Sequence, residues 1–189
     1  MKRTIISLAA ALLFLLPLGA QDSAKIISLI EKAYATPKAV NTNFTETYTS
    51  FDPATPQKVR EGSLSYDAGN IEMNYSNGDK FVIIGNTMTI KNATQNVTFD
   101  LTKNIMMRGL SHTLDYAFEG QLTKLAVEQN ADITASREGD FYLVTLKAKK
   151  KAPRGYSCIV AYYRVSDCLI NSMRMDEFNG ASTYYTITK

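Results

Sequence analysis

Few residues of this chain could do chemistry. His112 is the only histidine, Cys158 and Cys168 are the only cysteines, and tryptophan is absent. One histidine cannot supply the two imidazole ligands of a common zinc site. The sequence also contains no G-x-S-x-G nucleophile motif and no glycine-rich loop for phosphate. We therefore expect no catalytic residue, no metal and no cofactor, and we interpret the chain as a binding protein rather than an enzyme.

The two cysteines are expected to remain unbridged. If Ser166 and Asp167 form the tip of a hairpin, Cys168 faces Val165, and Cys158 lies seven residues further back along the strand. At ~3.3 Å per residue this separation is about 23 Å. A disulfide joins Cα atoms that are roughly 7 Å apart or closer. A bulge or a longer loop would fold the strand back and is the alternative.

Basic residues gather near the end of one predicted strand. They could protect an exposed sheet edge from pairing, which we favour, or dock on an anionic lipid or an acidic partner. The formal net charge of the 189 residues is only +3. A nucleic-acid partner is not expected from so small an excess. The members of the cluster are Lys147, Lys149, Lys150, Lys151 and Arg154.

The first twenty residues have the pattern of a cleaved export signal. Lys2 and Arg3 precede an apolar run over residues 4–16, and the small residue Ala20 suits cleavage before Gln21. The run is too short for a retained membrane anchor, which needs about 18 to 20 apolar residues. We expect residues 1–20 to be removed and residues 21–189 to form a single domain in the periplasm, without a lipid anchor because no cysteine follows the run.

The stretch 62–90 alternates apolar and polar residues, which is typical of a half-buried antiparallel sheet. Turn sequences interrupt the alternation, and Asn77-Gly78 is the strongest hairpin signal among them. Four short strands in a meander are therefore predicted here. Further strands are predicted at 40–51, 57–67, 97–99, 131–135, 141–149, 156–165, 169–178 and 183–188.

Two segments have helical periodicity instead. Residues 22–36 form one amphipathic stripe that Pro37 ends, and residues 106–128 repeat leucine or phenylalanine every three to four positions, with a break near Gly120. His112 lies beside the second stripe, where a solvated or capping role is favoured over a chemical one. The fold class is therefore α+β, with about ten to eleven antiparallel strands. A sheet of this size curls, so we expect a strongly curved, unclosed half-barrel with helices covering its concave face.

The meander also carries a family resemblance. A Gly-x-Leu-x-Tyr strand, an apolar-x-Met-x-Tyr strand, a Gly-Asp turn and Phe-Val-Ile-x-Gly-x-x-Met-x-Ile together resemble the periplasmic outer-membrane lipoprotein carriers, the LolA-like proteins. The resemblance implies an unclosed barrel capped by helices, with an apolar cavity for the acyl chains of lipoproteins. Members of that family hold the helical cover closed through an arginine of an Arg-Pro pair, whereas Asp67-Ala68-Gly69 stands at this place here.

The candidate ligand-binding residues lie on the meander and on the second helical stripe. One interpretation is that they line an apolar cavity, with Met106 and Met107 as further adaptable lining. The other is that they pack together as a filled core. The candidates are Met73, Tyr75, Phe81, Ile83, Met88, Ile90, Leu114 and Phe118.

The resemblance implies a carrier or chaperone that binds lipoprotein acyl chains, or other lipid, and takes part in protein transport during outer-membrane biogenesis. Its implied partners are acylated cargo, an inner-membrane release complex and an outer-membrane acceptor, and we expect a monomer. The alternative from another class is a non-enzymatic protein-interaction domain of the cell envelope, on the same fold but with a filled core.

Overall fold

The computed structural model describes residues 18–36 and 39–188. Residues 1–17 of the expected export signal lie outside this range, so cleavage before Gln21 stays a prediction. The described part contains helices α1 (Leu18–Ala33), α2 (Ile105–Phe118) and α3 (Leu122–Glu128), and strands β1 (Val40–Thr49), β2 (Lys58–Asp67), β3 (Asn70–Tyr75), β4 (Lys80–Ile84), β5 (Thr87–Lys91), β6 (Asn96–Asp100), β7 (Ala131–Glu138), β8 (Phe141–Ala148), β9 (Tyr156–Arg164), β10 (Ile170–Glu177) and β11 (Ser182–Thr188).

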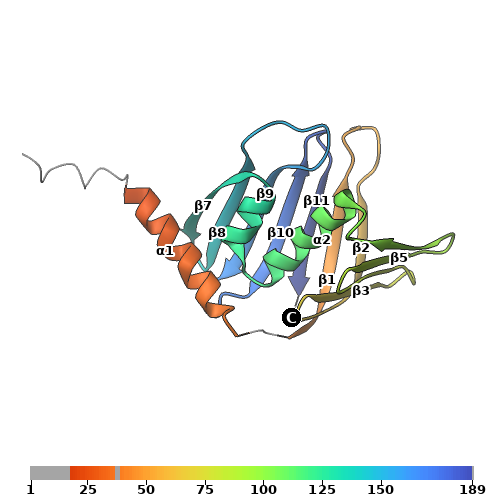
Figure 1. The fold of residues 1–189 in the computed structure, drawn as a ribbon, viewed down its shortest axis with the longest axis horizontal. Helices are drawn as coiled ribbons and strands as arrows, with labels where there is room; N and C mark the ends of the chain where they lie inside the picture. The colour runs from red at the N-terminus through yellow and green to blue at the C-terminus, as the bar shows by residue number, and fades with distance from the viewer. Residues whose placement is uncertain (1–17, 37–38, 189) are drawn as a thin grey trace, which may run out of the picture.

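All eleven strands belong to one antiparallel sheet in the order β6-β5-β4-β3-β2-β1-β11-β10-β9-β8-β7 (Figure 1). The pairing of β1 with β11, in which Phe44 lies opposite Ile187, joins an N-terminal and a C-terminal meander. The two edge strands are therefore β6 and β7, which are neighbours in sequence but the most distant strands in the sheet.

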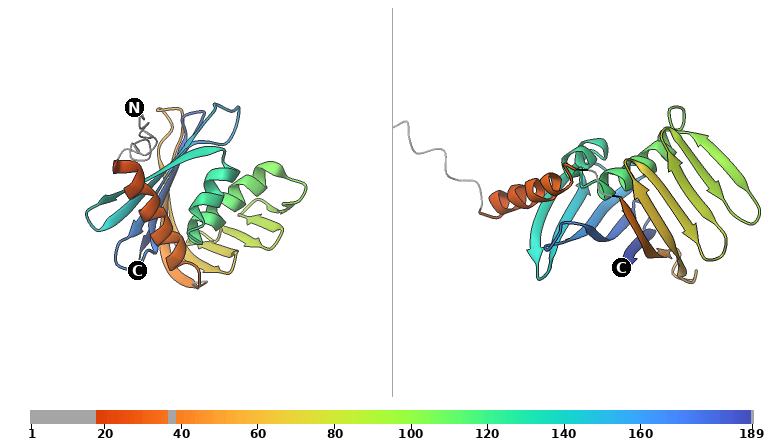
Figure 2. Two further views of the ribbon diagram at one scale, coloured as in Figure 1. Left: turned by 60° about the vertical axis from the view of Figure 1, so that its left-hand side comes forward. Right: turned by 90° about the horizontal axis from the view of Figure 1, so that it is seen from below.

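The sheet is curved, and the connection between its two edges crosses the concave side. An open sheet of more than about ten twisted strands normally curls. The connection contains the 14 residues of α2 and the 7 residues of α3, which span about 21 and 10 Å at ~1.5 Å per residue. Both helices lie on the concave side of the curved sheet (Figures 1 and 2). The predicted unclosed half-barrel with helices on the concave face is thus confirmed.

Helix α1 lies along the edge strand β7. Its predicted apolar stripe is confirmed, since Ile30 is fully buried and Ile26 is nearly so. The Ser23 hydroxyl accepts a hydrogen bond of 2.7 Å from the backbone N–H of Ala135 in β7. Because Ser23 follows the expected cleavage point, this bond would remain in the processed chain.

The expected end of α1 at residue 36 is wrong, because the helix ends at Ala33. The N–H of Ala35 donates to the carbonyl of Lys32 at 3.2 Å, three residues back rather than four. Such a tightened last turn ends an α-helix. Several strand limits differ from the prediction in the same small way, for example β7, which continues three residues past Ala135.

The predicted break of the second helical segment near Gly120 is confirmed. Gly120 has φ +60°, and a Cβ atom at this position would lie 2.5 Å from the ring of Tyr34. Glycine is therefore required both by the left-handed backbone and by the close approach of α1. None of the helices in the described ranges is long and apolar enough to cross a membrane.

Cys158 and Cys168 are not joined in a disulfide, as expected. The predicted hairpin register around Cys168 is wrong, however. Cys168 does not face Val165 but lies in the turn itself, with φ +57°, and its N–H donates to the carbonyl of Arg164 at 2.8 Å. Cys158 lies in β9 opposite Asp176 of β10.

Candidate ligand-binding site

The structure places six of the eight predicted site residues in one core cluster, and the other two, Phe81 and Ile90, pack against it. Register explains their proximity, since Met73 lies opposite Phe81 and Ile83 opposite Met88. Met73, Ile83, Met88 and Leu114 are at most 1% exposed. Tyr75 and Phe118 are also buried, whereas Phe81 and Ile90 are only partly buried.

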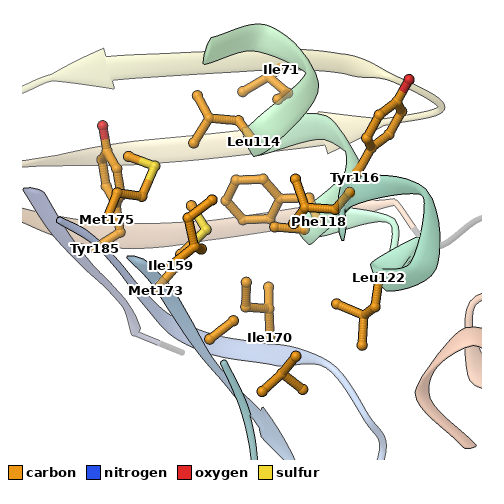
Figure 3. Close-up of a cluster of buried hydrophobic side chains, with 14 of the residues drawn as sticks. Ile71, Leu114, Tyr116, Phe118, Leu122, Ile159, Ile170, Met173, Met175 and Tyr185 are labelled. Atoms are coloured by element: carbon orange, nitrogen blue, oxygen red, sulfur yellow. The ribbon is translucent and has the colours of Figure 1, made fainter. Parts of the chain in front are cut away.

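The same cluster continues onto the C-terminal half of the sheet. In Figure 3 the side chains of Leu114 and Phe118 lie between Ile71 of the meander and Ile159 and Met173 of the other half. The side chains under the centre of α2 therefore contact both halves of the sheet. An apolar ligand that reaches this layer must displace or repack them, which unbranched methionine side chains tolerate best.

An open cavity adjoins this core at the start of α2. Its volume is about 740 Å³, within the ~300–1,000 Å³ typical of small-molecule pockets. We name it the α2 cavity. Its lining comes from the first turns of α2, the end of α3, the loop between β8 and β9 with the start of β9, and the residues around the end of β10. The lining residues are Ile105, Met106, Met107, Gly109, Leu110, Gln129, Pro153, Arg154, Gly155, Tyr156, Glu177, Phe178 and Asn179.

The rim and the floor of the α2 cavity are apolar. Ile105 and Met106 at the rim are 75% and 52% exposed. Met107, Leu110 and Tyr156 line the cavity and also pack against the core cluster. The cavity therefore leads from exposed apolar side chains to the core cluster through Met107, Leu110 and the ring of Tyr156.

The sequence around Asn104 sets the direction of these side chains. The Asn104 side-chain oxygen caps α2 by accepting a hydrogen bond of 3.1 Å from the N–H of Met107. From this start, Met106, Met107 and Leu110 share one side of the first two turns. Met106 and Met107 line the α2 cavity, and their expected role as adaptable lining for a ligand stays a prediction. Tyr156 and Phe178 were missed because they lie at strand ends far away in sequence.

The β8–β9 loop brings positive charge to the α2 cavity. Arg154 lines it, with its Nη1 atom 3.9 Å from the Sδ atom of Met106. Lys149 forms a salt bridge of 3.6 Å with Asp132. The interpretation of the basic cluster as edge protection is wrong, because β8 pairs with β7 on one side and β9 on the other.

Glu177 is the acidic residue of the cavity lining, and it lies opposite Tyr156 in the pairing of β9 with β10. Its Oε2 atom accepts a hydrogen bond of 3.0 Å from the Asn179 side chain. Burial raises the pKa of the neighbouring Tyr156 hydroxyl, and the charge of Glu177 adds to the rise. Tyr156 is therefore a neutral hydrogen-bonding group at neutral pH, in an otherwise apolar floor.

An aromatic contact joins the helical cover to the meander near the turn where the resembled family has an arginine. In the turn where that residue would stand, Ala68 and Gly69 both have positive φ, and the Gly69 N–H donates to the Tyr66 hydroxyl at 3.3 Å. The Tyr66 ring stacks on Phe118 of α2, with centroids 5.7 Å apart. Aromatic stacking thus joins the cover to the meander at this point.

His112 connects the two helices of the cover rather than capping one of them. Its Nδ1 atom lies 3.0 Å from the Glu128 carboxylate of α3, and its ring stacks on Tyr116 at 5.2 Å. Within the ranges 18–36 and 39–188, no three His, Cys, Asp or Glu side chains come together in a way that could hold a metal ion.

Two polar groups on the concave side were missed by sequence reasoning. Glu46 is buried and accepts hydrogen bonds from Arg60, at 3.1 Å to Nε, and from the Tyr75 hydroxyl. The sequence feature that could have identified Glu46 is an acidic residue at an inward-facing strand position between Phe44 and Tyr48. Asp115 of α2 was the other, and its pKa is raised to about 6 by burial and then by the charge of Glu119.

No protein-family model matches this sequence, and neither does any curated protein sequence. The fold is similar to several solved structures. One is a LolA superfamily protein from Nitrosomonas europaea, at 7% identity and a TM-score of 0.42, covering 92% of this chain and 93% of that one.

A second similar structure is a putative outer membrane lipoprotein-sorting protein domain from Vibrio parahaemolyticus, with 11% identity, a TM-score of 0.44, and coverage of 90% and 92%. A third is from the MucA/MucB complex of Pseudomonas aeruginosa, with 11% identity and a TM-score of 0.46, where the match covers 89% of this chain and 56% of that one. The family that the sequence motifs resemble is thus represented among these structures.

Proposed function

We propose that this protein is a periplasmic carrier that binds an acyl chain of a lipoprotein, or of another lipid, in the α2 cavity for transfer to the outer membrane. One observation carries the proposal. Ile105 and Met106 are exposed at the rim of a cavity whose floor is the hydrophobic core itself. Exposed apolar side chains gathered at a concavity are typical of a binding site for an apolar partner.

Burial of the acyl chain alone provides enough binding free energy for a reversible carrier. About eight methylenes at ~0.8 kcal/mol each contribute ~6 kcal/mol, which corresponds to a dissociation constant of tens of micromolar. Met106 and Met107 can adjust to a flexible chain, because a thioether side chain has three rotatable bonds and no branch. A carrier has to release its cargo, so an affinity of this size fits the proposed role.

The experiment compares two variants that place a glutamate at an exposed apolar position. Met106→Glu puts the charge at the cavity, in the first turn of α2, where an acidic residue favours the helix. Ile84→Glu is the matched control, because Ile84 is 62% exposed in β4 and does not line the α2 cavity.

We expect Met106→Glu to weaken binding of a fluorescent fatty acid and of a palmitoylated lipopeptide about tenfold, since about two methylenes lose their contact. Ile84→Glu should bind like the unchanged protein. Native mass spectrometry of the purified protein should also show co-purified lipid. Equal binding by the two variants, both folded by circular dichroism, would overturn the assignment of the cavity.

A second function is favoured by the filled layer under α2, where Met73, Ile83 and Met88 leave almost no exposed surface. On this alternative the fold is a protein-interaction domain of the cell envelope and the α2 cavity receives an apolar side chain of a partner protein. The two functions differ in one observable, because an interaction domain would bind neither the free fatty acid nor the lipopeptide.

A further inference from the structure

We infer that the α2 cavity selects amphiphiles with an acidic head group, and that Arg154 binds the carboxylate or phosphate of that group. The inference rests on the proposed function and narrows its cargo to one chemical class. It places the head group at the β8–β9 loop and the acyl chain along Met106, Met107 and Leu110. The charges around the cavity, rather than its apolar floor, carry the argument.

The end of β8 and the β8–β9 loop together supply an excess of positive charge. Residues 147–154 contain five basic side chains and no acidic one. In the described part of the chain, Lys149 is the member of this segment that forms a salt bridge, with Asp132 on β7. The remaining positive charge is therefore not compensated by a carboxylate of the protein, and an anion of the ligand can compensate it.

Arg154 is the basic residue of this segment that lines the cavity. Its guanidinium lies against the Met106 sulfur, a weak acceptor that leaves the strong donors available for a charged partner. Arginine offers a planar fork of N–H donors that matches two oxygens of a carboxylate or a phosphate. An arginine at this position can therefore bind the head group of a ligand whose acyl chain is buried in the cavity.

Glu177 is the acidic residue of the cavity lining, and it lies next to the β8–β9 loop because it pairs with Tyr156 across β9 and β10. Its carboxylate accepts a hydrogen bond from the Asn179 side chain. In the described part of the chain no salt bridge joins it to Arg154, so the guanidinium stays available to an anion of the ligand. An acidic head group meets an opposite charge at Arg154, whereas a neutral head group gains nothing there.

The test measures the affinity of the full protein for four palmitoyl amphiphiles below their micelle concentrations, by isothermal titration calorimetry. Palmitate carries a carboxylate, 1-palmitoyl lysophosphatidylglycerol carries a phosphate with net negative charge, 1-palmitoyl lysophosphatidylcholine is zwitterionic, and monopalmitoylglycerol is neutral. We expect the two acidic amphiphiles to bind about tenfold more tightly than the neutral one, as expected for one charge-assisted hydrogen-bonded contact. A preference for only one of the two acids would identify the head group as a carboxylate or as a phosphate.

Two variants distinguish a specific contact with Arg154 from a nonspecific attraction to the positive charge of the loop. Arg154→Gln should remove the preference, so that within this variant the acidic amphiphiles bind no more tightly than monopalmitoylglycerol. Lys151→Gln removes the same charge from the same loop but from a residue outside the cavity lining, and it should keep the preference. A preference that survives Arg154→Gln, or that Lys151→Gln removes equally, overturns the role of Arg154.

The outcomes also separate this inference from the proposed function. If all four amphiphiles bind equally and Met106→Glu weakens them all, the cavity carries lipid without head-group selection and only this inference fails. If none of the four binds, both fail.

Discussion

The hydroxyl of Tyr163 in β9 donates a hydrogen bond of 2.8 Å to the backbone carbonyl of Ala117 in α2, and both residues are fully buried. This bond connects the helical cover to the sheet at the residue directly before Phe118, which stacks on Tyr66. The cover is therefore attached to both halves of the sheet, by a hydrogen bond on one side and by aromatic stacking on the other.

Tyr163→Phe removes only the hydroxyl of this contact. The Ala117 carbonyl keeps an acceptor role toward the N–H of Gly120 at 3.2 Å, so the loss is that of one bond and not of a wholly unpaired group. We expect the free energy of unfolding to fall by about 1 kcal/mol, measured by urea denaturation. Tyr162→Phe changes a neighbouring tyrosine of β9 that is only partly buried and serves as control. An equal effect of both changes would contradict the role of the bond.

Arg60→Met tests the buried contact with Glu46. The Arg60 and Glu46 side chains are 39% and 5% exposed, so the variant leaves a carboxylate in the core without its cation. We expect the free energy of unfolding to fall by about 2–4 kcal/mol, at or below the range for broken buried pairs because Arg60 is partly solvated. A further change of Glu46→Leu should recover part of this loss.

The control for Arg60→Met is Arg174→Met, which breaks a salt bridge between Arg174 and Asp176 with side chains 56% and 28% exposed. Such exposed pairs contribute about 1 kcal/mol or less. Similar losses for the two arginine variants would show that the Arg60–Glu46 contact contributes no more to stability than an exposed salt bridge does.

The raised pKa of Asp115 predicts how the stability of the protein depends on pH. This pKa is raised from an ordinary 3.8 to about 6, by burial first and then by Glu119, while His112 and Lys124 oppose the rise. Between these two pKa values the folded protein holds more protons than the unfolded chain. Its stability therefore falls as pH rises from about 4 to about 6, and the loss persists above pH 6.

Asp115→Asn removes this titration. After allowance for solvent screening, we expect the variant to gain on the order of 1 kcal/mol relative to the unchanged protein at pH 7.5 and almost nothing at pH 4. Thermal unfolding at both pH values measures the difference. Asp140→Asn, at an exposed turn position between β7 and β8, controls for the change in net charge. A gain that is the same at both pH values would contradict the assignment to Asp115.

Gly62→Ala tests the close approach of β2 and β3. A Cβ atom at Gly62 would lie 2.2 Å from the backbone oxygen of Asn74, so the two strands must separate locally. We expect a loss of at least about 3 kcal/mol, or failure to fold, because backbone atoms cannot move aside as a side chain can. Gly109→Ala is the control, since a Cβ atom there meets nothing within 4 Å. A stable Gly62→Ala protein would show that this pairing is looser than described.

The sequence alone determined the local structure of the chain. Alternation with period two, broken at turns such as Asn77-Gly78, predicted the strands, because side chains of a strand point to opposite faces regardless of its partner. The leucine and phenylalanine repeat ending at Gly120 predicted the helical cover for a similar reason. The inward set of Met73, Met88 and Leu114 also followed from periodicity, since it depends only on neighbouring residues.

Only the tertiary structure decided which of these residues face a cavity. Met73 and Met106 are the same residue type on apolar stripes, yet one is buried in the core and the other is exposed at the rim of the α2 cavity. The difference arises from the pairing of β1 with β11 and from the curl that lets α2 cross the sheet. These contacts join residues more than a hundred positions apart, and local periodicity contains no information about such pairs. The contact between Arg154 and Met106 depends on the same curvature of the sheet.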